Sequence, residues 1–167
     1  MSGLIDSIDK NEVLRDLGYR GTPLTPQIES LVDMCISRTL EVIAPRFLYR
    51  RFAIERAEDG LHVSGTDVVL SGMSISEHLY NCDELYLMCV TIGGELDRLV
   101  RLKMATAPDG GVVYDSCGSA AVEKLAAEVE NMRAAEAARE GTTPTRRHST
   151  ENGPRPLAAQ GTMSEAA

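Results

Sequence analysis

Histidine and cysteine are the residue types in this chain with the widest chemical repertoire. The three histidines, His62, His78 and His148, stand in no nucleophile motif such as G-x-S-x-G or a cysteine-protease signature. We interpret them as surface or hydrogen-bonded residues. The four cysteines form no C-x-x-C pair, which argues against a zinc site and, in a reducing compartment, against disulfides. We interpret these as buried small hydrophobic residues: Cys35, Cys82, Cys89 and Cys117.

Two glycine-containing segments resemble anion-binding turns. TIGGEL, at 91–96, combines a strand, two glycines and a helix start, which can present backbone N–H groups to an anion. It lacks both a third glycine at G-x-G-x-x-G spacing and the lysine of a phosphate loop, so tight strand-to-helix packing is the favoured interpretation. In DSCGSAAVE, at 115–123, Gly118 and its small neighbours allow a helix to approach another closely, and Asp115 is a candidate cap.

Polar residues that could hold a ligand also occur toward the C-terminus. Glu123, Glu128 and Glu130 are typical of a solvated helix face, although a cationic ligand could use one of them. TRRHSTENGPRPLAAQ, at 145–160, has the Arg, Ser, Gly and Pro spacing of a ligand-binding loop but little apolar content to hold it folded. We therefore expect residues 141–167 to be either mobile or held by a partner.

The totals limit the class of protein. A chain of 167 residues, 43% hydrophobic, is long enough for one domain with a real core. Its net charge of −8 would repel a nucleic acid, so we expect no such partner. The sequence contains neither a secretory leader pattern nor an apolar stretch of membrane-spanning length, so we expect a cytoplasmic protein with no membrane partner.

Helices are predicted in the first third of the chain. Apolar spacing behind Asp9 predicts a short helix over residues 9–17. Thr25 as the cap and Pro26 in the first turn predict a second helix that ends before Pro45. Its apolar stripe comprises Ile28, Leu31, Val32, Cys35, Ile36, Leu40 and Ile43.

The middle of the chain is predicted to contain strands. Residues 46–56 are rich in aromatic and branched side chains, and Asp59-Gly60 predicts a hairpin turn. Residues 67–72 form another short strand, and Ser74, three residues before Glu77, has the capping-box spacing that opens a short helix. The nearly continuous apolar run at 84–93 predicts a central strand buried on both faces.

Two further helices are predicted, at 95–105 and after APDGG at 107–111. The second carries Val122, Leu125, Val129 and Met132 on its core face, and its alanine-rich end after Met132 has little left to bury. The pattern as a whole predicts an α+β core over residues 1–140, followed by a polar segment over 141–167.

Three segments, taken in order, resemble the activation (reactivation) domain of vitamin B12-dependent methionine synthase, most closely its small stand-alone bacterial versions. They are SIDKNEVLRDLGYRG, SGMSISEHLYNCDELYLMCVTIGGELDRLVRLKMA and VVYDSCGSAAVEKLAAEVE. The resemblance extends over residues 5–132, and TIGGELDRL and DSCGSAAVE are its most specific parts. It implies a C-shaped α+β domain, built on a twisted antiparallel sheet with flanking helices, that binds S-adenosylmethionine.

The resemblance also implies a role in cobalamin chemistry. In that family a flavodoxin-type donor supplies one electron to inactive cob(II)alamin while the domain presents the sulfonium methyl group to cobalt. The cobalamin belongs to a partner, a corrinoid-binding methyltransferase or methionine synthase. The domain is then a component of a methyltransferase system rather than a complete enzyme, and it contributes proximity and orientation.

Particular residues take part in the resemblance. Arg147 matches the arginine that meets the methionine carboxylate, and Ser149 follows it in the ligand loop. Thr150, Glu151 and Asn152 stand where the family has Pro-Gly-Tyr, with Glu151 able to attract a sulfonium. The flanking matches to the family pattern are Gly153, Pro156, Leu157 and Gln160.

Two acids complete the implied ligand set. Asp9 matches an acidic residue that could pair with the ligand's amino group, and Glu130 lies near the acid of the family's long helix. The family continues beyond the loop with further helix and strand, whereas this sequence stops after GTMSEAA. Two hypotheses follow: a reactivation domain that binds S-adenosylmethionine, or a degenerate interaction module that docks on a corrinoid protein without binding the methyl donor.

Overall fold

The structure, a computed structural model, describes residues 4–21, 23–145 and 147. These residues form an α+β protein with two compact units. The helical unit consists of the described residues up to Arg46 together with Val90–Glu140. The sheet unit consists of Phe47–Cys89, with which the described residues after Glu140 group.

The helical unit is organised around one long helix. α1 (Lys10–Asp16), α2 (Pro26–Val42) and α4 (Glu95–Thr106) each pack against α5 (Pro108–Arg139). Both predicted caps of the first two helices are confirmed. The Asp9 carboxylate accepts a hydrogen bond from the Asn11 N–H at 2.8 Å, and the Thr25 hydroxyl accepts one from the Ile28 N–H at 3.4 Å.

Small residues let α4 and α5 lie side by side. A Cβ atom at Gly111 would lie 2.8 Å from the Met104 backbone nitrogen, and one at Gly118 would lie 3.0 Å from Leu96 Cδ2. The close-approach interpretation of DSCGSAAVE is therefore confirmed. The prediction that Asp115 caps this helix is wrong, because α5 already begins at Pro108 and Asp115 lies within it.

The distal end of α5 differs from its prediction. Met132, expected in the core, is 42% exposed, whereas Ala137 is buried and the Arg133 side chain is only 12% exposed. Arg133 pairs with Glu136 one turn further on. The alanine-rich end is thus partly buried, because small side chains on a helix allow close packing that hydrophobicity alone does not indicate.

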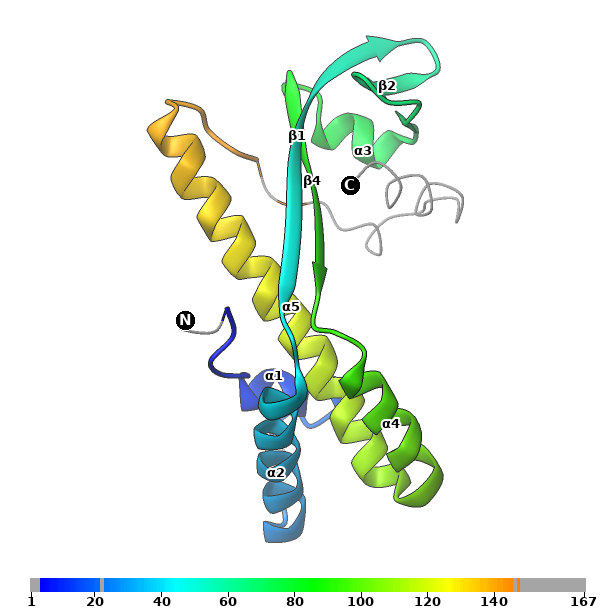
Figure 1. The fold of residues 1–167 in the computed structure, drawn as a ribbon, viewed down its shortest axis with the longest axis vertical. Coiled ribbons are helices and arrows are strands. Elements are labelled where there is room, and N and C mark those ends of the chain that lie inside the picture. Colours follow the sequence, from blue (N-terminus) through cyan, green and yellow to red (C-terminus); the bar gives the residue numbers. More distant parts are fainter. Residues whose placement is uncertain (1–3, 22, 146, 148–167) are drawn as a thin grey trace. The chain divides into compact units, whose positions relative to one another are not determined.

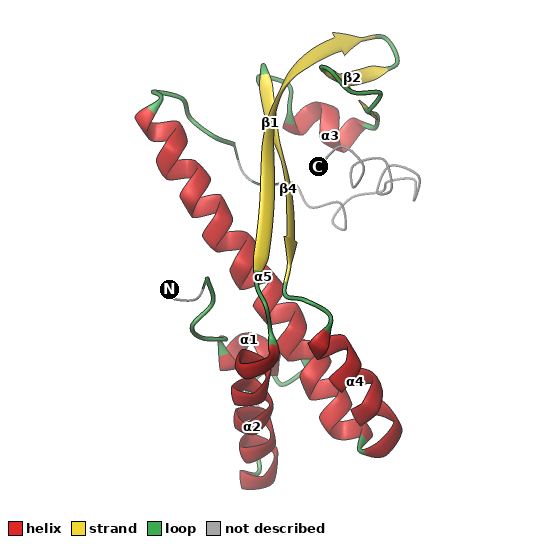
Figure 2. Ribbon diagram, in the orientation of Figure 1, coloured by secondary structure: helices red, strands yellow, loops and turns green. Residues whose placement is uncertain are grey.

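The sheet unit is a curled antiparallel sheet, shown in yellow in Figure 2. β1 (Arg46–Ala57), β2 (Gly60–Val63), β3 (Val69–Leu70) and β4 (Glu84–Thr91) stand in the order β3-β2-β1-β4. β1 and β2 form the predicted hairpin, in which Ile54 pairs with Val63. β3 continues the sheet with Leu61 opposite Leu70. The predicted α+β class with an antiparallel sheet and flanking helices is confirmed.

One face of this sheet carries the core of its unit. α3 (Met73–His78) follows β3 and contributes Ile75, with Leu79 just beyond it. The other members of the cluster come from the strands and the connection before β3: Phe52, Ile54, Leu61, Val63, Val68, Leu70, Leu85 and Leu87. The buried residues of β2 and of the core-facing parts of β1 and β4 alternate with less buried ones, as expected when one face of an antiparallel sheet is covered.

Two predictions for this unit are wrong. The apolar run at 84–93 is an edge strand with Leu85 and Leu87 buried and Tyr86 36% exposed, not a central strand buried on both faces. The apolar run suggested burial on both faces because the residues of β4 that point away from the core, such as Tyr86, are also large and apolar. The cap of α3 is Gly72, with φ +117°, and Ser74 lies inside the helix, so the capping box does not form.

Candidate functional site

The residues implied to bind S-adenosylmethionine fall in different parts of the chain. Asp9 and Glu130 belong to the helical unit, and Arg147 is an exposed residue of the segment that groups with the sheet unit. Ser149, Glu151 and Asn152 lie outside the described residues. The structure therefore bears on the environment of Asp9 and Glu130, and the ligand loop stays a prediction.

Asp9 has a structural function of its own. Its carboxylate caps α1 through the Asn11 N–H, while the neighbouring Ile8 side chain is buried. A carboxylate accepts several hydrogen bonds, and Asp9 is exposed, so capping leaves capacity for a ligand amine. The cap thus fixes the position of the carboxylate that the resemblance assigns to ligand binding.

The N-terminal segment that carries Asp9 meets α5 near Lys124. Lys124 forms an ion pair with Glu128 at 3.0 Å, and this hydrogen bond is the main reason that the pKa of Lys124 is raised. The negative charge of Asp6 acts in the same direction, so Asp6 lies near this turn of α5. Ile5, beside Asp6, is buried.

Glu130 lies on the same helix, further along. It is half-buried, and it stands six positions after Lys124, which corresponds to about 9 Å along a helix axis. One turn beyond it is Arg133, whose largely buried side chain pairs with Glu136. Sequence reasoning named Glu130 but missed the Arg133–Glu136 pair, for which an Arg three residues before a Glu in an alanine-rich helix was the available signal.

A buried polar cluster lies between α2 and α5, outside the implied ligand set. Burial raises the pKa of the Cys35 thiol and of the Tyr114 hydroxyl, which hydrogen-bond to each other. Burial also raises the pKa of Cys117 to about 12, while the nearby Thr39 hydroxyl acts in the opposite direction. Both thiols are therefore protonated at neutral pH and are poor nucleophiles.

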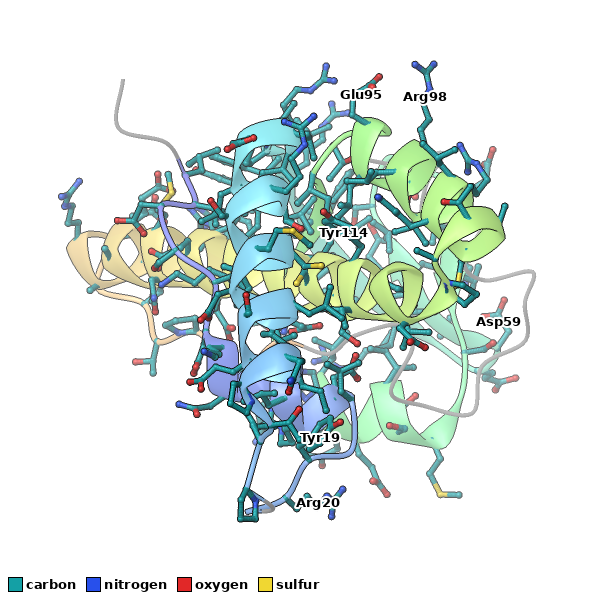
Figure 3. All side chains as sticks on the ribbon, turned by 90° about the horizontal axis from the view of Figure 1, so that it is seen from below. Tyr19, Arg20, Asp59, Glu95, Arg98 and Tyr114 are labelled. Atoms are coloured by element: carbon teal, nitrogen blue, oxygen red, sulfur yellow. The ribbon has the colours of Figure 1, made fainter. Side chains whose placement is uncertain are left out.

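Figure 3 shows Tyr114 among the side chains between the helices, while Glu95 and Arg98 of α4 point outward. The prediction of buried cysteines is confirmed for Cys35 and Cys117. It is wrong for Cys89, which is exposed, and Cys82 is only partly buried against the sheet core. Cys89 lies on the edge strand beyond the core cluster, where the alternation of the strand no longer implies burial.

The glycine turn before α4 fits packing better than anion binding. Gly93 has φ +85°, and a Cβ there would lie 3.3 Å from the Ala44 Cβ, so tight packing is confirmed. The first turn of α4 already carries Glu95 and Asp97. These carboxylates interact favourably with the positive end of the helix and would repel a phosphate.

The sheet unit contains a cavity of about 360 Å³ beside the β1–β2 turn. Its walls include Arg56, Asp59, Ser76 and Tyr80. The Arg56 Nη2 group donates to the carbonyl oxygens of Leu79, Tyr80 and Cys82 at 3.1, 2.9 and 2.6 Å. Arg56 is thus engaged in holding the chain after α3.

The other polar pair at this turn is Asp59 and His62, 2.8 Å apart. The hydrogen bond to His62 lowers the pKa of Asp59. Both side chains are well exposed, which confirms His62 as a hydrogen-bonded surface histidine. His148 lies outside the described residues.

Two classes of site are absent from the part of the chain that the structure describes. There, no three His, Cys, Asp or Glu side chains gather in a way that would hold a metal ion. No helix in the same residues combines the length and apolar character needed to cross a membrane.

No family model and no curated protein matches the chain. The resemblance to the activation domain therefore depends on the segments named above. Two of those segments meet directly, because Leu96 of TIGGELDRL lies against Gly118 of DSCGSAAVE. The first segment, which includes Asp9 and α1, packs on the same helix.

Proposed function

We propose that this chain is a stand-alone reactivation domain for a cobalamin-dependent methyltransferase of the methionine synthase type, with S-adenosylmethionine as its methyl donor. The observation that carries the proposal is the meeting of the three resembling segments on α5. α1 and α4 pack on this helix, and Gly118 receives Leu96. The first and third segments, and the part of the second from Val90 onward, thus belong to the helical unit.

The charged groups of the helical unit suit part of the ligand. S-adenosylmethionine carries an ammonium group and a sulfonium, and both are attracted by carboxylates. Asp9 is held in place by its capping bond, and Glu130 is half-buried on α5, the helix that the N-terminal segment meets. Arg147 would supply the bidentate donor for the ligand carboxylate. The corrinoid and the flavodoxin-type donor would be supplied by partner proteins.

Calorimetric titration with S-adenosylmethionine is the primary test. The proposal predicts saturable binding, and the absence of heat at millimolar ligand would remove the donor function. Arg147→Ala should weaken binding by about 1 to 3 kcal/mol, the value of a hydrogen bond to a charged group. Arg98→Ala is the matched control, because Arg98 is an exposed arginine that pairs with Glu95 at 3.0 Å.

A second variant separates the two functions of Asp9. Asp9→Asn keeps an efficient helix cap but removes the negative charge. We expect an unchanged melting temperature with ligand binding weakened several-fold. Equal affinity of Asp9→Asn and the wild type would exclude Asp9 from the site.

The alternative is an interaction module that docks on a corrinoid protein without the methyl donor. It is favoured by Thr150-Glu151-Asn152 in place of Pro-Gly-Tyr, and by the capping bond, which accounts for Asp9 without a ligand. Pull-down with a purified corrinoid protein, with and without S-adenosylmethionine, separates the two. The reactivation function predicts that the ligand changes the amount of partner retained, whereas the module predicts no change.

A further inference from the structure

The cavity of the sheet unit is not used by the proposed function. Its volume of about 360 Å³ is within the range of small-molecule sites. One wall is the end of the β1–β2 hairpin, and the other is the chain around α3, which Figure 2 shows beside the hairpin. The three hydrogen bonds of Arg56 fasten these two segments to each other. The cavity therefore has walls that are held in a fixed relation before any ligand binds.

The ionised side chains that line this cavity are mostly acidic. Glu58 and Asp59 line it from the hairpin turn, and the hydrogen bond to His62 lowers the pKa of Asp59, which keeps its carboxylate charged at neutral pH. Arg56 is the one basic residue of the lining, and its Nη2 group is already engaged by three carbonyl oxygens. Its Nη1 group lies 3.9 Å from Asp83 Oδ1. The charge of the lining thus favours a cationic ligand over an anionic one.

The remaining lining groups narrow the kind of cation. Ser71 and Ser76 supply hydroxyl groups, and Tyr80, which is 74% exposed, supplies an aromatic ring. A metal ion would need several close ligands, and the described part of the chain contains no group of three His, Cys, Asp or Glu side chains that could hold one. Organic cations are instead recognised by carboxylates together with an aromatic face. This combination is the one that the cavity offers.

We propose that this cavity binds a small organic cation that carries a guanidinium or an ammonium group. The charged end of the ligand pairs with the carboxylates of Glu58 and Asp59, and its apolar stem lies along the Tyr80 ring. The hydroxyl groups of Ser71 and Ser76 accept hydrogen bonds from the same charged end. The site belongs wholly to the sheet unit, whereas Asp9 and Glu130 belong to the helical unit.

NMR titration of the ¹⁵N-labelled full chain is the first test, with n-butylguanidine and n-butylamine as the probes. The backbone amide signals of residues 56–61 and 71–80 should shift in a saturable way with at least one of the two cations. The neutral compound n-butylurea has the shape of n-butylguanidine without its charge, and it should cause no such shifts. The absence of saturable shifts with both cations, or equal shifts with n-butylurea, would overturn the proposal.

Asp59→Asn tests the charge of the site. This variant should keep the hairpin, because Asn-Gly favours the same tight turn as Asp-Gly. It should raise the dissociation constant of the bound cation by roughly threefold, the size expected for a partly exposed ion pair. Asp97→Asn is the matched control, because Asp97 is an exposed acid of α4 in the helical unit. Equal dissociation constants for the two variants would overturn the proposal.

Tyr80 tests the aromatic part of the site. Tyr80→Leu should raise the dissociation constant by roughly threefold through loss of the cation–π contact, whereas Tyr80→Phe should keep it near the wild-type value. Neither change should affect folding, because the side chain is mostly exposed and only the backbone carbonyl of Tyr80 meets Arg56. Wild-type affinity in Tyr80→Leu would overturn the proposal. None of these measurements involves S-adenosylmethionine, so this proposal and the proposed function can fail separately.

Discussion

The helical unit and the sheet unit are filled by different kinds of side chains. α5 buries small residues in its first half, among them Gly110, Gly111, Ser116, Cys117, Ala120 and Ala121. The sheet unit instead buries large aliphatic and aromatic groups such as Phe52, Ile54, Leu85 and Leu87. The first half of α5 therefore depends on the close approach of helices, whereas the sheet unit depends on the volume of its side chains.

This difference predicts opposite sensitivities. Helices in close contact tolerate little added volume, because a new methyl group meets backbone that cannot move without shifting a whole helix. A core of large side chains loses most when volume is removed, because a cavity remains. Substitutions that add or delete a few atoms can therefore distinguish the two units.

The largest change in the free energy of unfolding is expected from a substitution in the sheet unit. Leu87→Ala removes a buried side chain from the sheet core and should lower the free energy of unfolding by about 2 to 5 kcal/mol. Leu48→Ala, at an exposed position of β1, should change it by less than about 0.5 kcal/mol. Denaturant titration measures both. Similar losses in the two variants would contradict the idea that side-chain volume holds this unit.

In the helical unit, adding one methyl group should be harmful. Gly111→Ala would bring a Cβ to 2.8 Å from the Met104 backbone nitrogen, and should cost about 1 to 3 kcal/mol of stability. Gly110→Ala meets nothing within 4 Å, so greater helix propensity should stabilise by up to about 1 kcal/mol. Thermal melts of the two neighbouring variants give the comparison. Equal effects would rule out close helix approach as the constraint.

The units should also differ at alkaline pH. Cys117 has a folded-state pKa of about 12, above its ordinary value of 9.0, so its contribution is complete below pH 9 and is lost as the pH rises toward 12. Linkage gives a loss of roughly 1 kcal/mol between pH 9 and pH 10. Chemical denaturation at both pH values measures it. Cys117→Ala should reduce this pH dependence, whereas Cys82→Ser in the sheet unit should leave it unchanged.

The smallest change in stability is expected where Gly118 of α5 lies against Leu96 of α4, the second close contact of these helices. Gly118→Ala brings a Cβ to 3.0 Å from Leu96 Cδ2, the end of a flexible side chain that can rotate away. The gain in helix propensity, up to about 1 kcal/mol, should offset this displacement. We expect a nearly unchanged melting temperature. A loss as large as that of Gly111→Ala would mean that Leu96 is fixed in position.

Local signals in the sequence predicted much of the fold. Asp9, Thr25 and Pro26 marked helix starts correctly, because capping acts over a few residues. Asp59-Gly60 likewise marked the hairpin turn. The errors arose where the outcome depends on distant neighbours. The position of β4 at a sheet edge depends on strand order, and the burial of Ala137 depends on what packs against α5.

The candidate site was less predictable than the fold. The resemblance predicts that Asp9 binds the ligand, and the apolar spacing behind it predicts that it caps a helix. The structure confirms the cap. Arg133 escaped notice because a long, flexible cation on a helix usually points to solvent, and only packing reveals that its stem is covered. Ser149, Glu151 and Asn152 remain predictions.

The three carbonyl oxygens that share the Arg56 guanidinium group have a consequence for local motion. Leu79, Tyr80 and Cys82 follow α3, and Arg56 belongs to β1, so α3 cannot separate from the hairpin without breaking all three bonds. The hairpin and α3 should then open as one cooperative unit in hydrogen exchange. A single cation thereby links the protection of two segments more than twenty positions apart in the chain.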